Sequence, residues 1–272
     1  MPQLSLFPKF CTALSLDELP GRVAETGLDA VNLLIRPGFW VTPDDALETA
    51  PRFVQAIRRA GLAVDFCTWC ALPEQILDGE DTLRLFADLG IKGFRLGYYT
   101  LRDGVPLSVQ LREANEDLQR IVPVLERYGL RAVFQIHHEN LVNSTSLAAL
   151  LMEGLPDQVF GVMLDVGNQG FEGMEYWSRA VKVLGPHWSA LGVKDTTVRR
   201  IDGVPERQWA PCQEGDSNWA DICAAYAESP GRDRDPWVLM PFYHEDDVDR
   251  HLAVLREEVA FIRRHLDAAQ LQ

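Results

Sequence analysis

The chain has 272 residues, a formal net charge of −14, and 47% hydrophobic and 24% charged residues. This composition is typical of a globular chain with a large core, and its acidity argues against binding of nucleic acid through a basic face. No apolar run approaches the roughly 18 residues of a membrane-spanning helix, and the first residues do not resemble a signal peptide. We therefore expect no membrane segment and a cytoplasmic location, which the five sparse cysteines also favour.

Short runs rich in β-branched and aromatic residues alternate with longer segments of helical periodicity. Eight such runs predict strands at 4–11, 29–35, 62–69, 92–97, 130–137, 159–165, 188–194 and 236–242. Most intervals between them hold one helix and two short loops, which is the repeat of a βαβ unit. The interval after the seventh run is the longest and predicts a long loop.

Several residues predict where helices begin and end. Thr42 as N-cap and Pro43 at the first helical position indicate one start, and Gly61 indicates its end. Pro123 predicts a kink or a restart inside the fourth helix. The last helix is expected from 245–247 to 263–265, with one apolar stripe facing the sheet that consists of Leu252, Leu255, Val259, Ile262 and Leu266.

Strict alternation of eight strands and eight helices predicts one α/β domain over 1–272, a single (β/α)₈ TIM barrel. In that fold the functional residues lie at the carboxyl ends of the strands. An open doubly wound sheet is the alternative, but the glycine-rich turn after its first strand is missing. Gly167, Gly170 and Gly173 follow a late strand with a different spacing, so they are a poor phosphate cradle.

Cys67 and Cys70 form a Cys-x-x-Cys motif next to the third predicted strand. Residues three apart on a strand point to opposite faces, so the pair is expected neither to chelate a metal nor to form a disulfide.

Polar residues gather at the carboxyl ends of five predicted strands; they are Arg36, Arg95, Gln135, His137, Asp165, Asn168 and Lys194. Each alone is explained by a salt bridge, a loop contact or a cap. In a barrel, however, they ring one cavity, where a buried charge costs several kcal/mol unless it is paired. The three cations favour an anionic ligand. We expect neighbouring cations to lower the pKa of Lys194, which suits it for proton transfer without a metal.

The motifs Arg36-Pro-Gly, Phe94-Arg-x-Gly-Tyr-Tyr, Gln135-x-His137, Leu-Asp165-x-Gly-Asn168, Glu172-Gly173 and Val193-Lys-Asp195 together resemble the sugar phosphate isomerase/epimerase family. That family belongs to the xylose isomerase-like barrel superfamily. The resemblance implies proton transfer through an enediolate, whose charge a divalent cation stabilises. The superfamily also includes DNA repair nucleases, which the acidic charge and the six histidines argue against.

In metal-bearing relatives the resemblance implies four ligands, which are Glu, Asp, His and Glu on strands five to eight. These positions fall on Gln135, Asp165, Gly192 and the neighbourhood of Pro241, so Asp165 alone is retained. We therefore expect Mn, Mg or Zn to bind weakly or not at all, through a residual set of Gln135, Asp165 and His137. His244 or Glu245 would be replacement ligands.

The expected function is that of a sugar or sugar-phosphate isomerase or epimerase acting on a small polyhydroxylated, anionic substrate. The expected catalytic residues are Lys194, Asp165 and Glu214, and the expected substrate-binding residues are Arg36, Arg95, His137 and Asn168. A second hypothesis remains open, in which a degenerate barrel binds a carbohydrate-like metabolite without turnover.

Overall fold

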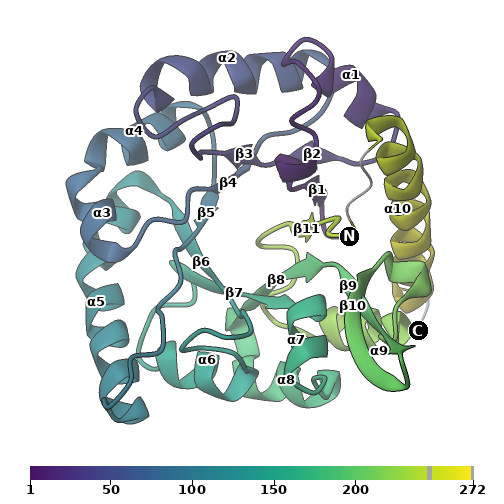
Figure 1. Cartoon of the computed structure of the whole chain (residues 1–272). Helices are drawn as coiled ribbons and strands as arrows, with labels where there is room; N and C mark the ends of the chain where they lie inside the picture. The colour runs from purple at the N-terminus through teal and green to yellow at the C-terminus, as the bar shows by residue number, and fades with distance from the viewer. Residues whose placement is uncertain (244–246, 271–272) are drawn as a thin grey trace.

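A computed structural model describes residues 1–243 and 247–270 and contains one closed parallel barrel (Figure 1). The strands are ordered β2-β1-β11-β8-β7-β6-β5-β4-β3. The end strands β2 (Ala30–Val31) and β3 (Leu33–Leu34) are separated only by Asn32, so they are two halves of one strand that closes the sheet. The other strands are β1 (Leu4–Leu6), β4 (Phe66–Thr68), β5 (Gly93–Arg95), β6 (Arg131–Gln135), β7 (Phe160–Asp165), β8 (Trp188–Val193) and β11 (Trp237–Leu239).

The helices surround the barrel in a ring (Figure 1). They are α1 (Leu19–Ala24), α2 (Ala46–Arg59), α3 (Pro73–Asp78), α4 (Glu80–Asp88), α5 (Leu107–Tyr128), α6 (Thr145–Leu151), α7 (Val166–Glu172), α8 (Trp177–Leu184), α9 (Trp219–Ala227) and α10 (Val248–Gln270). Three short 3₁₀ helices, η1 (Pro8–Phe10), η2 (Gly185–His187) and η3 (Cys212–Glu214), lie in the connections. The predicted α/β TIM barrel is confirmed, and each of the eight predicted strands contains a strand of the barrel.

Helix boundaries differ in places from those predicted. The helix α2 begins at Ala46, three residues after Pro43, because Asp45 rather than Thr42 is the N-cap. The Asp45 carboxylate accepts hydrogen bonds from the Thr42 N–H and the Thr49 hydroxyl, both at 2.9 Å. Gly61 follows the helix with a φ of 83°, as predicted.

The two long helices also depart from expectation. The helix α5 runs without a restart across Pro123. The helix α10 continues to Gln270, beyond the predicted end, and its predicted start at 245–246 lies outside the described residues. Its apolar stripe is buried as expected, and it consists of Leu252, Leu255, Val259, Ile262 and Leu266.

The predicted long loop after the seventh strand is wrong, because an antiparallel hairpin stands there. It consists of β9 (Asp195–Ile201) and β10 (Val204–Ala210), and η3 and α9 follow it. The turn residues Asp202 and Gly203 have positive φ values of 51° and 84°. Asp-Gly with left-handed backbone at both positions is the usual sequence of a two-residue hairpin turn.

Side chains alternate along the strands between two cores. Val133 and Met163 belong to the cluster inside the barrel, whereas Phe134 and Leu164 belong to the larger cluster under the helices. The interior cluster consists of Phe7, Leu34, Phe66, Val133, Met163, Ala190, Val238 and Met240. The next inward-facing residue of each strand therefore lies one layer closer to the carboxyl end of the barrel, which we call the mouth.

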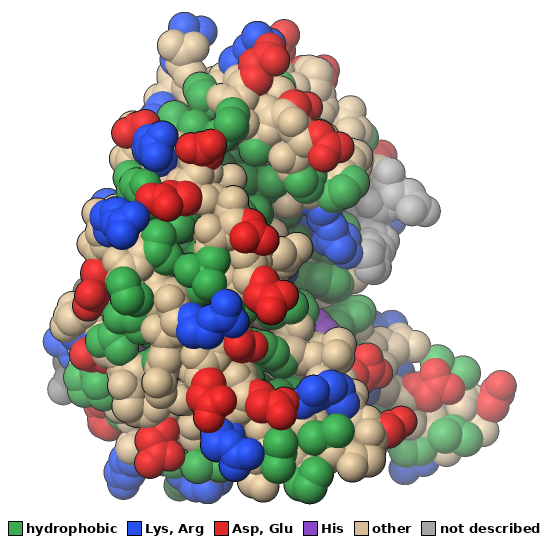
Figure 2. All heavy atoms as spheres, turned by 90° about the vertical axis from the view of Figure 1, so that its left-hand side faces the viewer, with side chains coloured by type: hydrophobic (Ala, Val, Ile, Leu, Met, Phe, Trp, Pro, Cys, Tyr) green, Lys and Arg blue, Asp and Glu red, His purple; other side chains and the backbone are tan. Residues whose placement is uncertain are grey.

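The outer helical surface carries acidic and basic side chains side by side (Figure 2). The same view shows a hollow at the edge of the molecule, with Lys or Arg side chains beside it and a histidine inside it. Within the described part of the chain, no helix combines the length and apolarity needed to cross a membrane.

Candidate functional site

A polar layer lies directly above the apolar interior of the barrel. Arg95, Gln135 and Asp165 each end a strand, and Lys194 follows β8 by one residue. Their side chains are buried, with exposed fractions of 8%, 1%, 0% and 3%. Buried charges at this density are tolerated only when they satisfy one another.

Asp165 is the centre of this layer. Its Oδ1 accepts a hydrogen bond from the backbone N–H of Asn168 at 2.9 Å, which also caps α7. Its Oδ2 accepts a hydrogen bond from the Gln135 amide and lies 3.4 Å from Nζ of Lys194. Three donors therefore surround one fully buried carboxylate.

Arg95 fixes the orientation of Gln135. Its guanidinium donates to Oε1 of Gln135, to the Tyr98 hydroxyl at 2.5 Å and to Sγ of Cys70 at 2.5 Å. The Tyr98 hydroxyl also donates to Oε1 of Gln135, at 2.5 Å. Because arginine has no acceptor, the carbonyl oxygen of Gln135 must face Arg95 and its NH₂ group must face Asp165.

Lys194 lies in a cage of polar and aromatic groups. Its Nζ donates to Oδ1 of Asn168 at 2.8 Å and lies 4.4 Å and 4.5 Å from the ring centres of Trp209 and Phe242. Burial lowers the pKa of Lys194; Asp165 opposes this effect, and Arg95 and Lys9 add to it. The direction agrees with the sequence prediction, but the main cause is burial rather than the neighbouring cations.

Aromatic rings continue the wall of the mouth beyond Lys194. The His137 ring lies 4.7 Å from that of Tyr98 and 4.5 Å from that of His138, which in turn stacks on Phe171 at 4.8 Å. The pKa of His137 is lowered, mainly by burial. Its Nδ1 lies 2.6 Å from the carbonyl oxygen of His138 and 3.1 Å from the side-chain nitrogen of Asn140.

Two further cations lie at the rim, and sequence reasoning identified only one of them. Arg36, which was expected among the residues around the cavity, is exposed after β3. Lys9, in η1, lies 5.2 Å from the ring centres of both Phe10 and Phe242. The pKa of Lys9 is lowered by burial and by the charges of Arg36 and Arg95. Lys9 follows β1, which ends at Leu6, but the strand predicted at 4–11 contained it, so it was not recognised as a residue at a strand end.

Glu214 and Asp195 differ in their surroundings. Glu214 is exposed at the end of η3, and none of the described side-chain contacts joins it to the Asp165 cluster. Asp195 is buried and accepts hydrogen bonds from the Ser217 hydroxyl at 2.7 Å and the Trp219 indole at 2.8 Å. Asp195 therefore anchors the segment between the hairpin and α9.

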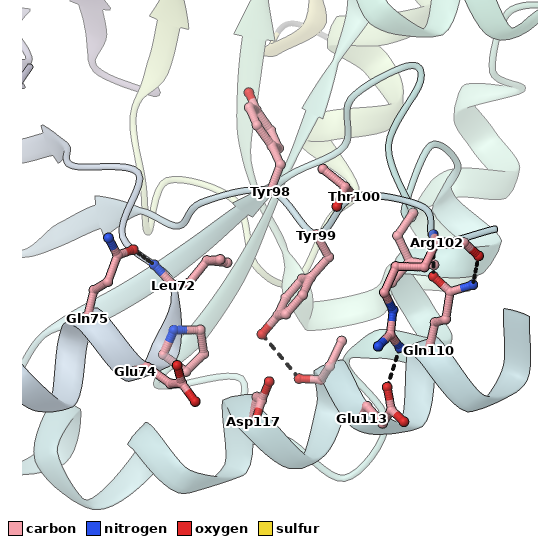
Figure 3. Close-up of a pocket in the computed structure, with 13 residues that line it drawn as sticks. Leu72, Glu74, Gln75, Tyr98, Tyr99, Thr100, Arg102, Gln110, Glu113 and Asp117 are labelled. Carbon is pink, nitrogen blue, oxygen red and sulfur yellow. Dashed lines mark hydrogen bonds and ion pairs between the residues drawn. The ribbon is translucent and has the colours of Figure 1, made fainter. Parts of the chain in front are cut away.

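A cavity of about 500 Å³ lies beside the mouth, between α3, α5 and the loop after β5. Tyr98 and Tyr99 point in opposite directions there, Tyr99 towards α5 and Tyr98 towards the strands (Figure 3). The buried Gln110 holds this loop by accepting from the Arg102 N–H at 2.8 Å and donating to the Val105 carbonyl at 2.7 Å. Tyr98 thus links the cavity to the polar layer of the barrel.

The two cysteines of the Cys-x-x-Cys motif differ in solvent exposure. Cys67 is buried within β4, whereas Cys70 is exposed beyond the strand end with a φ of 60°.

Gly167 and Gly170 allow close packing: a Cβ at 167 would lie 2.7 Å from the Trp209 ring and 2.8 Å from Cγ of Lys194. These glycines let the hairpin and Lys194 approach α7.

The fold is that of a (β/α)₈ barrel, with a buried polar layer at its mouth. The family model described as xylose isomerase-like TIM barrel matches residues 20–265. The chain belongs to this family. No curated protein matches the sequence significantly.

Solved structures with the same fold include several sugar epimerases. A D-psicose 3-epimerase, crystallised in the presence of D-fructose, is 13% identical with a TM-score of 0.72, over 98% of this chain and 99% of its own. An L-ribulose 3-epimerase is 15% identical with a TM-score of 0.73, over 99% and 95%. A xylose isomerase-like TIM barrel protein from Mycobacterium smegmatis in complex with magnesium is 15% identical with a TM-score of 0.72, over 98% and 97%. At these identities the similarity establishes the fold.

The residues around Asp165 do not fit a divalent metal. No group of three or more His, Cys, Asp or Glu side chains converges within the described residues. Gln135 directs its NH₂ group, not its oxygen, towards Asp165, and His137 contacts Tyr98 and His138 instead. Hard divalent ions need several oxygen ligands. The other two residues named as replacement ligands, His244 and Glu245, lie outside the described residues.

Proposed function

We propose that this protein is a sugar or sugar-phosphate isomerase or epimerase that acts on a small polyhydroxylated, anionic substrate. The observation that carries the proposal is the charge of the mouth. Lys9, Arg36, Arg95 and Lys194 converge there with the carboxylate of Asp165. Within the described part of the chain, no ion pair joins Lys9, Arg36 or Arg95 to a carboxylate. An anionic substrate supplies the missing charge.

The proposed reaction moves one proton and needs no oxidant. Removal of a proton from a carbon next to a carbonyl group leaves an enediolate, and return of a proton to another position or face gives the isomer or epimer. Lys194, whose lowered pKa favours proton exchange, is the proposed acid/base group. Asp165 and Asn168 orient its ammonium group, and Glu214 is proposed to contribute a carboxylate from its loop.

Substrate binding is assigned to the residues around this ammonium group. Arg36 and Lys9 hold the anionic group. Arg95 donates its hydrogen bonds to Gln135 and Tyr98, and its positive charge attracts the anion from the buried polar layer. His137 and Asn168 are proposed to contact hydroxyl groups. The names of the epimerases with the same fold support a carbohydrate ligand. The free cysteines and acidic charge support a cytoplasmic location and no nucleic-acid partner.

Isotope exchange tests this function. The protein is incubated with ketoses, aldoses and their phosphates in D₂O, and NMR follows deuterium incorporation and new isomers. We expect exchange at one carbon for at least one substrate, and its loss in Lys194→Met. Saturable binding without any exchange would instead support a barrel that binds a carbohydrate without turnover.

A further inference from the structure

Oδ2 of Asp165, the carboxylate oxygen nearest to position 192, already faces two donors. Oδ1 is used by the Asn168 N–H at 2.9 Å, and Oδ2 is used by the Gln135 amide and the ammonium of Lys194. The orientation of Gln135 is not adjustable, since Arg95 and the Tyr98 hydroxyl occupy its carbonyl oxygen. A metal at Oδ2 would therefore have to displace the amide of Gln135, whose oxygen cannot turn towards it.

Gly192 excludes the histidine that the family resemblance places there. A Cβ at position 192 would lie 2.6 Å from Oδ2 and 2.9 Å from Cγ of Asp165. Any side chain at this position requires Asp165 to leave its present place. The glycine and the inward-turned carboxylate thus belong to one arrangement, which differs from a site that has ligands on both strands.

The space beside Asp165 suits an organic cation. Nζ of Lys194 contacts one carboxylate and one amide oxygen, at 3.4 Å and 2.8 Å, and two aromatic rings cover its remaining sides. Aromatic faces stabilise ammonium groups, whereas they give a hard divalent ion no ligand atoms. Gly167 makes this placement possible because a Cβ there would collide with Cγ of Lys194 at 2.8 Å.

We propose that the ammonium group of Lys194 takes the place beside Asp165 that a divalent cation takes in metal-bearing relatives, so that this chain works without a metal. The inference rests on the proposed function for its catalytic meaning. In that reaction the amine of Lys194 takes up the proton of the substrate, and the ammonium group so formed faces the negative oxygen of the enediolate, with Asp165 and Asn168 fixing its position. The charge supplied is smaller than that of a metal ion, and Arg95 adds to it through Gln135.

Metal titration of the full chain tests the proposal directly. We expect MnCl₂ and MgCl₂ to give no saturable heat in calorimetry, and EDTA to leave the melting temperature unchanged. A ligand present at about a hundredfold excess over its dissociation constant raises the melting temperature of a domain this large by roughly 5–10 °C. One saturable Mn²⁺ per chain that is lost in Asp165→Asn would overturn the proposal.

Chemical rescue gives a second, independent readout. Lys194→Ala removes the ammonium group, so methylammonium chloride should raise the melting temperature of this variant by several degrees more than sodium chloride of equal ionic strength. The wild type and the surface variant Lys182→Ala should respond equally to the two salts. A Lys194→Ala variant that responds like the wild type would show that no cation site lies there. If Lys194→Ala fails to fold, the same comparison of salts on Lys194→Met and the metal titration of the wild type still test the proposal.

The outcomes separate this inference from the proposed function. Isotope exchange that survives EDTA and vanishes in Lys194→Met supports both. Exchange that EDTA abolishes and Mn²⁺ restores supports the isomerase or epimerase function and overturns the inference. Methylammonium rescue without exchange on any sugar keeps the inference about the cation position and rejects the function.

Discussion

The carboxylate of Asp165, on β7, fills the space above the backbone of Gly192, on the neighbouring strand β8. The two residues are register partners in the sheet, and a Cβ at 192 would lie 2.6 Å from Oδ2 of Asp165. The absence of a side chain on one strand is therefore what allows the buried carboxylate on the next strand to point inward. This pair determines whether position 192 can contribute to the site at all.

Gly192→Ala should destabilise the protein, because the new methyl group displaces the Asp165 carboxylate from its three donors. Overpacking of this kind costs about 1–3 kcal/mol, and the disturbed hydrogen bonds add to it. Urea denaturation followed by tryptophan fluorescence measures the loss.

Gly21→Ala is the matched control for this substitution. Gly21 lies within α1, and a Cβ there meets nothing within 4 Å. Alanine is favoured over glycine inside a helix by about 0.5–1 kcal/mol, so this variant should be neutral or more stable. Equal effects of the two substitutions would contradict the close approach of Asp165 and Gly192.

Lys9→Met should reduce the preference for a phosphorylated sugar over its neutral parent. Lys9 shares the mouth with Arg36 and Arg95, whose charges lower its pKa, and an anion placed among them relieves that repulsion. A hydrogen bond to a charged group contributes about 1.5–3 kcal/mol, so the preference should fall roughly tenfold or more. Calorimetry on a sugar and its phosphate measures it, with Lys182→Met as the control.

Lys9 gives a cleaner test of the anion site than Arg95. Arg95→Ala would remove one of the two donors to the buried oxygen of Gln135 and the donor to the Tyr98 hydroxyl, so a loss of binding would be mixed with a loss of structure. Equal affinities of the wild type for the sugar and its phosphate, unaffected by Lys9→Met, would assign the rim cations to structure alone.

The barrel and its polar layer were predictable because both follow from alternation along strands. Gln135 lies two residues after Val133, and Asp165 two residues after Met163, so interior position and strand end follow from the sequence. The hairpin was missed, although Asp202-Gly203 is a recognisable turn. With it, sequence reasoning missed Trp209, which covers Lys194.

Other features depend on tertiary contacts that no local pattern encodes. The direction of the Gln135 amide follows from Arg95, which lies 40 positions away. Thr42 and Pro43 satisfy the statistical rule for a helix start, yet the carboxylate of Asp45 binds the Thr42 N–H ahead of α2 and the helix begins only after Asp45, without a side-chain capping bond. Arg95 was predicted to hold an anion, but its two terminal nitrogens donate to neutral partners that only the packed barrel brings together.

Asp235→Ala should cost far more stability than the loss of a surface carboxylate. Arg131, at the start of β6, donates to both oxygens of Asp235 just before β11, with the shortest contact at 2.9 Å. The two side chains are 13% and 3% exposed. Removing one partner of a buried pair costs about 3–5 kcal/mol, measurable by urea denaturation.

Asp81→Ala is the control for this prediction. It breaks an exposed ion pair with Arg84 at 3.3 Å, in which the side chains are 74% and 59% exposed. Such a pair contributes less than about 1 kcal/mol. Similar losses in both variants would contradict the assignment of the Arg131–Asp235 pair as a stabilising contact at the amino end of the barrel.

Glu258 should make the stability fall as the pH rises from about 4.5 to about 7. The side chain is buried on α10, and burial raises its pKa from 4.5 to about 7, although the Cys212 N–H at 2.9 Å opposes this shift. Between these values the folded state holds a proton that the unfolded state has lost, so unfolding becomes easier as the pH increases. A pKa difference of this size corresponds to about 3 kcal/mol.

Glu258→Gln keeps an oxygen for the Cys212 N–H and removes the titration. Its free energy of unfolding should therefore lack this decline, whereas the variant Glu257→Gln, at the exposed neighbouring position, should retain it. Urea denaturation across this pH range measures all three proteins, and identical pH profiles for the wild type and Glu258→Gln would show that Glu258 ionises at an ordinary pH in the folded protein.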